Sequence, residues 1–192
     1  MILCDLPYGT TKCAWDVSSY LRLSNLQDYK YDIFWEKERL TNIQQVKRRV
    51  GKTVESISVF YRKQCTYNPQ MVKYDGKPRS NKVKNGTLGE LTDNAVKKVK
   101  EYKDTGWRYP TQVWKFQRDC LKSNLHPTQK PVALLEELIK TFSNEGDTVL
   151  DNCMGSGSTG VACFNTGRMF LGMELDEGYF EIAQKRLEEV ME

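Results

Sequence analysis

The stretch TVLDNCMGSGSTGVACFNTGRMFLGME, residues 148–174, decides the fold. Its first three residues predict a short buried strand, and a glycine-rich turn at residues 151–157 follows that strand directly. Residues 160–166 then predict a short helix, and residues 169–173 predict a second strand. Strand, helix and strand in this order are typical of a parallel sheet in an α/β protein.

Further apolar patterns lie on both sides of this stretch. Apolar residues at helical spacing predict a helix over residues 131–142 and a final amphipathic helix over residues 180–190. Near the N-terminus, residues 2–4 predict the end of a buried strand, and β-favouring residues predict strands at 31–35 and 56–61. We therefore expect one α/β domain.

The middle of the chain has a different composition. Residues 62–125 lack apolar periodicity and contain many Asn, Gly, Lys and Pro residues, which predicts a loop-rich region. Residues 36–122 carry 21 Lys and Arg against 9 Asp and Glu, although the whole chain has a net charge of only +4. A basic segment between acidic ends is typical of a polyanion-binding surface. A solvated lysine-rich surface is the alternative.

Composition also excludes several classes of protein. No apolar run approaches the roughly 20 residues that a membrane span needs, and the acid Asp5 comes too early for the apolar core of a signal peptide. The six cysteines include no C-x-x-C pair, and there is only one histidine, so we expect neither a zinc site nor a disulfide framework. We expect a cytoplasmic protein with reduced thiols, no metal and no membrane partner.

The turn of residues 151–157 and the carboxylate of Glu174 together predict a cofactor site. Glycines in such a turn let a ligand approach the backbone, and a carboxylate at the end of the next strand can accept hydrogen bonds from both hydroxyls of a ribose. The sequence GSGSTG at 155–160 also satisfies a dinucleotide fingerprint, so a nicotinamide-dependent dehydrogenase is an alternative. Residues 151–165 contain no basic side chain for a pyrophosphate. A cofactor with a ribose but no phosphate, such as S-adenosylmethionine, therefore fits better.

A second candidate site follows the first predicted strand, where Asp5, Leu6, Pro7 and Tyr8 are consecutive. The Asp5 carboxylate and the Leu6 carbonyl can accept hydrogen bonds from the exocyclic amine of a flat base, and Tyr8 can stack on its ring. Pro7 biases Leu6 towards an extended conformation. A turn with an acid and a tyrosine is also common in proteins that bind no base.

Taken together, these segments resemble the DNA amino-methyltransferases, in the permuted order in which the catalytic motif precedes the cofactor motif. The resemblance rests on DLPYG at 5–9, HPTQKP at 126–131 and DNCMGSGSTG at 151–160. It is almost continuous from residue 126 to 187 and includes residues 55–69. It implies a Rossmann-like sheet of the S-adenosylmethionine-dependent methyltransferases.

The resemblance also implies roles for individual residues. The residues implied in binding S-adenosylmethionine are Thr128, Gln129, Lys130, Asp151, Met154, Gly155, Gly157 and Glu174. Among them, the three residues of the HPTQKP stretch would close over the cofactor, and Glu174 would bind its ribose. The catalytic motif, where proteins of the family bind the target base, would consist of Asp5, Leu6, Pro7 and Tyr8.

By the same resemblance, the substrate is double-stranded DNA, whose target base would be flipped out of the helix. Aspartate at position 5 favours the N6 amine of adenine over the N4 amine of cytosine, which is the alternative. The residues implied in DNA binding are Lys47, Arg48, Arg49, Lys73, Lys77 and Arg79. Residues 62–125 would contain the target-recognition region, and a restriction endonuclease is a candidate partner.

Two segments that such methyltransferases possess are missing from this sequence. One precedes the catalytic motif, and the other is a helix and hydrophobic strand between Tyr8 and Tyr31. Loss of an inner strand leaves its two neighbours unpaired, which is costly in a parallel sheet. Our hypothesis is a shortened, prophage-derived methyltransferase with impaired activity. A non-catalytic remnant that only binds DNA is the alternative.

Overall fold

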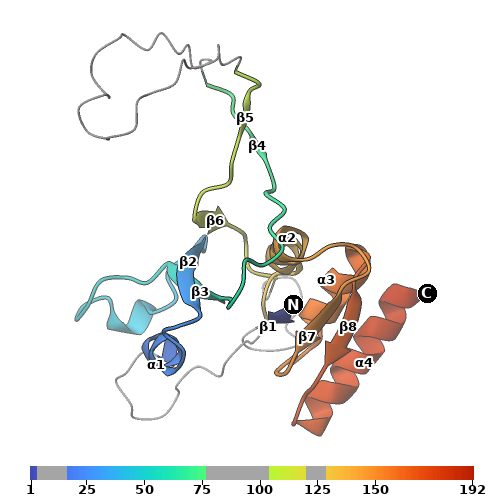
Figure 1. Cartoon of the computed structure of the whole chain (residues 1–192). Helices are drawn as coiled ribbons and strands as arrows, with labels where there is room; N and C mark the ends of the chain where they lie inside the picture. The colour runs from blue at the N-terminus through green and yellow to red at the C-terminus, as the bar shows by residue number, and fades with distance from the viewer. Residues whose placement is uncertain (4–16, 77–103, 120–128) are drawn as a thin grey trace, which may run out of the picture. The chain divides into compact units, whose positions relative to one another are not determined.

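The computed structural model describes residues 1–3, 17–76, 104–119 and 129–192 (Figure 1). It divides into two units, of which the first comprises Met1–Asn68 with Thr111–Glu192, and the second comprises Pro69–Pro110. Within the described ranges, no helix is long and apolar enough to cross a membrane.

The first unit contains a three-stranded parallel sheet, which we call the parallel sheet. β7 (Thr148–Asp151) lies in its middle, between β1 (Ile2–Leu3) and β8 (Met169–Gly172). Leu3 lies beside Asp151 in the β1–β7 pair, and Asp151 lies beside Gly172 in the β7–β8 pair. The predicted parallel arrangement is therefore confirmed.

Three helices accompany this sheet where the sequence predicts them. They are α2 (Val132–Phe142), α3 (Ser158–Asn165) and α4 (Glu177–Met191). α3 packs against α2, α4 and β8. Ile139 of α2, Val149 of β7 and Ala162 of α3 are fully buried in one apolar cluster. The helical period of the apolar residues thus produces the face that each helix buries.

Gly160 allows the close packing of α3 in this core. A Cβ atom at this position would lie 2.7 Å from Leu187 of α4 and 2.8 Å from the Phe170 ring of β8. Both distances are shorter than an ordinary carbon–carbon contact. A residue with a side chain at position 160 would therefore push α3 away from the sheet.

The opposite face of the parallel sheet carries exposed apolar side chains and is not covered by any described element. Residues in register on parallel strands point to the same face, so Ile2, Leu150 and Leu171 share it. Ile2 is 68% exposed and Leu171 is 52% exposed, as is Met169 at 59%. The prediction of a buried strand at residues 2–4 is thus wrong for Ile2, because no described element covers this face.

A second sheet of the first unit, which we call the mixed sheet, has the order β3-β2-β6. β2 (Tyr29–Glu36) pairs antiparallel with β3 (Val54–Phe60) and parallel with β6 (Val113–Lys115). Ile33, Trp35 and Trp114 of this sheet are buried and belong to the same apolar cluster as α2 and β7. The predicted strands at 31–35 and 56–61 are confirmed.

A short helix that the sequence analysis missed, α1 (Val17–Ser24), accompanies the mixed sheet. Its Arg22 makes an ion pair of 2.9 Å with Asp32 of β2. The same guanidinium donates hydrogen bonds to the hydroxyls of Ser56 and Ser58 on β3, both at 3.2 Å. These contacts hold α1 on the hairpin.

The region predicted to be loop-rich contains three short strands among its described residues. β6 belongs to the mixed sheet, and β4 (Val72–Lys73) pairs antiparallel with β5 (Trp107–Arg108) in the second unit. Arg108 makes an ion pair of 2.7 Å with Asp104, and its guanidinium lies 4.7 Å from the centre of the Tyr74 ring. Strands of two or three residues are too short to show a period in the sequence.

The sequence predicts that an inner strand is missing between Tyr8 and Tyr31. Among the described residues, α1 precedes β2 and no strand lies between β1 and β2 in the chain. In the described part of the first unit, the strands form two separate three-stranded sheets, in which β1 and β3 are both edge strands. Residues 4–16, which contain part of the affected segment, lie outside the described residues.

Candidate cofactor site

The glycine-rich turn connects the end of β7 to the start of α3. Gly155 and Gly157 both have positive φ angles, 52° and 75°. The N–H of Met154 donates to the carbonyl of Met173 at 3.0 Å, which ties the turn to the residue after β8. Because glycine adopts a left-handed conformation without steric cost, the turn can reverse within a few residues.

Asp151 holds the turn from inside. One of its carboxylate oxygens accepts a hydrogen bond from the N–H of Cys153 at 3.0 Å, and the other accepts one from the Thr159 hydroxyl at 2.6 Å. The residue is only 3% exposed. Both oxygens are therefore engaged in shaping the turn and attaching it to the first turn of α3.

Glu174 joins the same turn from the end of β8. One carboxylate oxygen accepts a hydrogen bond from the N–H of Gly155 at 2.8 Å. The other accepts bonds from the N–H groups of Leu175 and Asp176 at 2.9 and 3.0 Å. The acid predicted to bind a ribose thus lies directly beside the glycine turn, and its orientation is fixed by three backbone donors.

Of the HPTQKP stretch, Thr128 lies outside the described residues, whereas Gln129 and Lys130 directly precede Pro131, the residue that caps α2. Gln129 is 7% exposed, and both polar atoms of its side-chain amide lack a hydrogen-bond partner among the described residues. A buried amide without partners is costly and rare in proteins. Gln129 therefore has the donor and acceptor that a polar ligand would satisfy.

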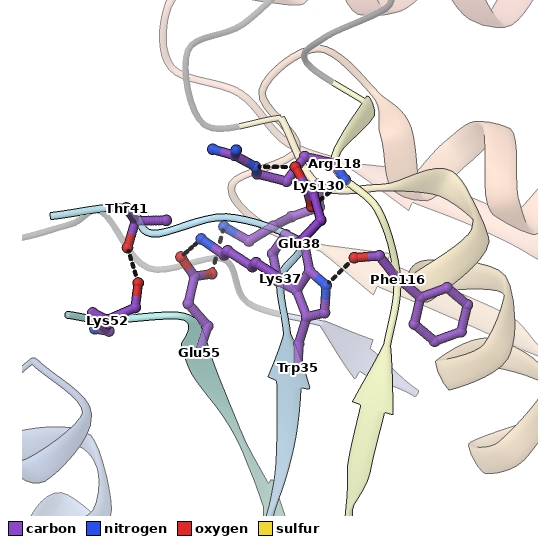
Figure 2. Close-up of polar contacts among 9 residues, drawn as sticks. All are labelled: Trp35, Lys37, Glu38, Thr41, Lys52, Glu55, Phe116, Arg118 and Lys130. Atoms are coloured by element: carbon purple, nitrogen blue, oxygen red, sulfur yellow. Dashed lines mark hydrogen bonds and ion pairs between the residues drawn. The ribbon is translucent and has the colours of Figure 1, made fainter. Parts of the chain in front are cut away.

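Lys130 makes a different contact. Its ammonium group lies 3.9 Å from a carboxylate oxygen of Glu55 on β3 (Figure 2). The sequence analysis included Glu55 in the resembling stretch but assigned it no role. Residues 55 and 130 are too far apart in the chain for a local pattern to pair them.

The catalytic motif itself, Asp5, Leu6, Pro7 and Tyr8, lies outside the described residues. The structure does describe the strand that leads into it. β1 and β7 are parallel, and Leu3 lies beside Asp151. The chain therefore leaves β1 at the same edge of the sheet at which the glycine turn begins, which is the edge where α/β proteins bind their ligands.

The predicted DNA-binding residues divide between the two units. Lys47, Arg48 and Arg49 are exposed in the loop between β2 and β3, directly after the 3₁₀ helix η1 (Ile43–Gln45). Lys73 is exposed on β4 of the second unit, and Lys77 and Arg79 lie outside the described residues.

The described residues provide neither a cluster of metal ligands nor an accessible thiol at Cys163. The described ranges contain no group of His, Cys, Asp and Glu residues arranged to hold a metal ion. Cys163 of α3 is fully buried, and this burial, reinforced by the nearby Asp151 carboxylate, raises the pKa of its thiol to about 12. The thiol is a core side chain, as expected for a reduced cysteine.

Comparison with known proteins identifies the family to which this fold and glycine turn belong. The family profile described as DNA methylase matches residues 27–185, which is most of the chain. The chain belongs to the N6/N4 DNA methylase family. The family resemblance predicted from the motifs is thereby confirmed, as is the α/β methyltransferase fold.

Individual relatives agree with this assignment. The DNA adenine methyltransferase YhdJ of Escherichia coli K12 is 32% identical over 149 residues, which are 75% of this chain and 48% of YhdJ. The type II methyltransferase M2.DpnII of Streptococcus pneumoniae is 51% identical over 63 residues, 33% of this chain and 24% of that protein. This DNA methylase chain thus spans about a quarter to a half of the length of these relatives.

Solved structures are similar over most of the chain. The M1.HpyAVI–SAM complex superposes with a TM-score of 0.56 at 29% identity, over 91% of this chain and 71% of M1.HpyAVI. The cytosine-N4-specific PvuII DNA methyltransferase has the same TM-score at 17% identity, over 92% of this chain and 61% of that protein, and shows a shared fold.

Proposed function

We propose that this chain is a DNA methyltransferase that transfers a methyl group from S-adenosylmethionine to the exocyclic N6 amine of adenine in double-stranded DNA. The observation that carries the proposal is the parallel register of β1 with β7. It places the end of β1, the strand that precedes Asp5 in the sequence, at the same edge of the sheet as the start of the glycine turn. A methyl donor and a methyl acceptor must meet at such a common edge.

The described residues suit S-adenosylmethionine in three respects. The positive φ angles of Gly155 and Gly157 support a turn whose backbone a ligand can approach. Glu174 stands at the end of β8, hydrogen-bonded to this turn, in the position of a ribose acceptor. Gln129 offers a buried amide that has no hydrogen-bond partner in the part of the chain that the structure describes. When bound, the cofactor would supply a methyl group already activated by a sulfonium.

The residues of the chain would then act on the base. The amine of adenine is a poor nucleophile because its lone pair is delocalised into the ring. We assign the Asp5 carboxylate and the Leu6 carbonyl to accept hydrogen bonds from the two N–H groups of the amine, which favours a tetrahedral nitrogen with a localised lone pair. Tyr8 would stack on the ring and hold it in place. Positioning and electrostatics would thus account for most of the rate.

Phosphate contacts would come from the basic residues. Lys47, Arg48 and Arg49 form a run of three exposed cations on one hairpin loop, and Lys73 is exposed in the second unit. Each contact with a phosphate releases condensed counterions, so binding should weaken as salt rises. A role for residues 62–125 in target recognition, and a restriction endonuclease that cuts the same site, belong to this proposal.

A methylation assay tests the function. The chain is incubated with methyl-labelled S-adenosylmethionine and unmethylated double-stranded DNA, which is then digested to nucleosides. We expect label in N6-methyladenine, and we expect Asp5→Ala to abolish labelling while changing DNA affinity little. Glu181→Ala removes an exposed carboxylate of α4 and should methylate like the unaltered chain.

The other outcomes identify the alternatives. Label in N4-methylcytosine retains the methyltransferase but overturns the choice of adenine. Folded protein that binds DNA and transfers no label contradicts the enzyme and supports the DNA-binding remnant. Equal labelling by the unaltered chain and Asp5→Ala contradicts the role of Asp5.

A further inference from the structure

Two lysines from distant parts of the chain meet one carboxylate (Figure 2). Glu55 on β3 makes an ion pair with Lys37, which directly follows β2, through one carboxylate oxygen. Its other oxygen lies 3.9 Å from the ammonium nitrogen of Lys130, which precedes α2. The side chains of Lys37, Glu55 and Lys130 are 7%, 16% and 19% exposed. The three groups therefore interact with little screening by water.

The hairpin end of this cluster is held in place. The ammonium group of Lys37 lies 4.7 Å from the centre of the Trp35 ring, in cation–π geometry. Trp35 is 2% exposed, and its indole N–H donates to the carbonyl of Phe116 at 2.8 Å. Glu55 itself belongs to a strand that pairs with β2 along its whole length. The carboxylate of Glu55 is thus attached to the rigid part of the mixed sheet.

The segment at the other end of the cluster contains Gln129. Lys130 lies between Gln129 and Pro131, and Pro131 is fully buried. One residue further, the N–H of Val132 donates to the Asp119 carboxylate at 2.8 Å. Residues 129–132 are therefore anchored at the Lys130 side chain and at the Val132 backbone. Between two such anchors, the Gln129 amide has little freedom to move.

We propose that Glu55 is a positioning residue for the cofactor site, which acts through Lys130 to hold the Gln129 amide in its binding position. This inference rests on the proposed function, since the ligand of that amide is S-adenosylmethionine. Without the carboxylate, two ammonium groups with little exposure would repel each other across the same space. Lys130 would move away, and the backbone of Gln129 would move with it.

The test measures the affinity for S-adenosylmethionine by calorimetry, without DNA and without turnover. Glu55→Gln keeps the shape of the side chain and removes its charge. We expect its dissociation constant to rise on the order of tenfold, because small displacements of a binding group are costly. At saturating cofactor, kcat should change by less than about threefold, since no reacting group is altered.

A matched control separates this effect from general destabilisation. Asp32→Asn removes the charge of another poorly exposed carboxylate in the mixed sheet, which pairs with Arg22 of α1 at 2.9 Å and does not contact Lys130. It should lower the melting temperature about as much as Glu55→Gln and leave the affinity for S-adenosylmethionine within about twofold. Glu55→Asp keeps the charge and should retain most of the affinity.

A double-mutant cycle tests the route through Lys130. If Glu55 acts on the cofactor only through this lysine, adding Glu55→Gln to Lys130→Met should weaken binding no further than Lys130→Met does. Independent, additive losses would overturn the proposal. So would cofactor binding by Glu55→Gln that equals that of the unaltered chain or of Asp32→Asn.

Failure of the proposed function has a different signature. If the folded, unaltered chain does not bind S-adenosylmethionine, both the cofactor assignment and the role of Glu55 are wrong. If the unaltered chain binds it and the variants do not follow the expected order, only the role of Glu55 is wrong. If Glu55→Gln does not fold, the remaining variants test the role of Glu55. That role is wrong if Lys130→Met and Glu55→Asp both bind S-adenosylmethionine as tightly as the unaltered chain does.

Discussion

At the scale of single residues, the two acids Asp151 and Glu174 stabilise the glycine turn, in addition to the contacts with S-adenosylmethionine that are expected of them. Asp151 uses both carboxylate oxygens to hold the turn, and Glu174 orients its carboxylate with three backbone N–H groups. Sequence spacing correctly places these acids beside the turn. It does not reveal which of their oxygens the protein itself occupies, because the donors come from the folded turn.

Thr159 provides a direct test of the Asp151 contacts. Thr159→Val keeps the shape of the side chain and removes the donor that Asp151 accepts at 2.6 Å. Since Asp151 is buried, loss of this bond should lower the free energy of unfolding by about 1–3 kcal/mol. Urea denaturation measures this change. Thr159→Ser retains the hydroxyl as the control, and equal stabilities of the valine and serine variants would contradict the structural role.

At the scale of elements, local periodicity predicts the regular structure of the C-terminal part. The structure contains all five elements predicted for this part, with ends that differ from the predicted ends by a few residues; they are α2, β7, α3, β8 and α4. Each has an apolar period or a glycine boundary of its own. α1 was missed, because its eight residues provide little apolar pattern, and its contacts are polar bonds from Arg22 to the mixed sheet.

Alanine substitutions at two glycines distinguish the destabilisation caused by a left-handed backbone conformation from that caused by a steric contact. Gly146 and Gly157 have φ angles of 81° and 75°, but a Cβ atom at 146 would meet nothing within 4 Å, whereas one at 157 would lie 3.1 Å from the Cβ atom of Ala183. Gly146→Ala should cost about 1–2 kcal/mol, the backbone penalty alone. Gly157→Ala should cost more and weaken the binding of S-adenosylmethionine.

Thermal unfolding and calorimetry with the cofactor measure the two effects. Gly146→Ala serves as the matched control, because it changes the same backbone conformation outside the cofactor turn. Equal losses of stability in the two variants would show that the close approach of position 157 to Ala183 of α4 does not contribute to the destabilisation.

At the scale of the whole chain, the uncovered face of the parallel sheet is the main departure from an ordinary α/β fold. Parallel sheets normally have helices on both faces. Here Ile2, Met169 and Leu171 are each more than half exposed on one face. The described residues between Tyr8 and the start of β2 contain only the helix α1, which contacts the mixed sheet and not this face.

Dye binding tests this open face. The double variant Met169→Lys/Leu171→Lys should bind less of the hydrophobic dye ANS than the unaltered chain, because it replaces two exposed apolar side chains. Its melting temperature should change little, since neither side chain is buried. The control is Val149→Lys, which introduces a charge at a fully buried position of β7 and should unfold the protein. A large loss of stability in the double variant would show that the face is covered.

The sequence by itself determined the features that depend on neighbours in the chain. These are the strand–glycine turn–helix unit, the acid that follows β8 and the family to which they belong. Their physical basis is local, because periodicity and glycine conformation act over a few residues. Only the tertiary structure decided that Glu55 pairs with both Lys37 and Lys130. It likewise decided that, among the described residues, the Gln129 amide is buried without a partner and one face of the parallel sheet is exposed. Such features depend on which distant segments pack together. Contacts between distant segments leave no repeating pattern in the sequence, so they cannot be read from it.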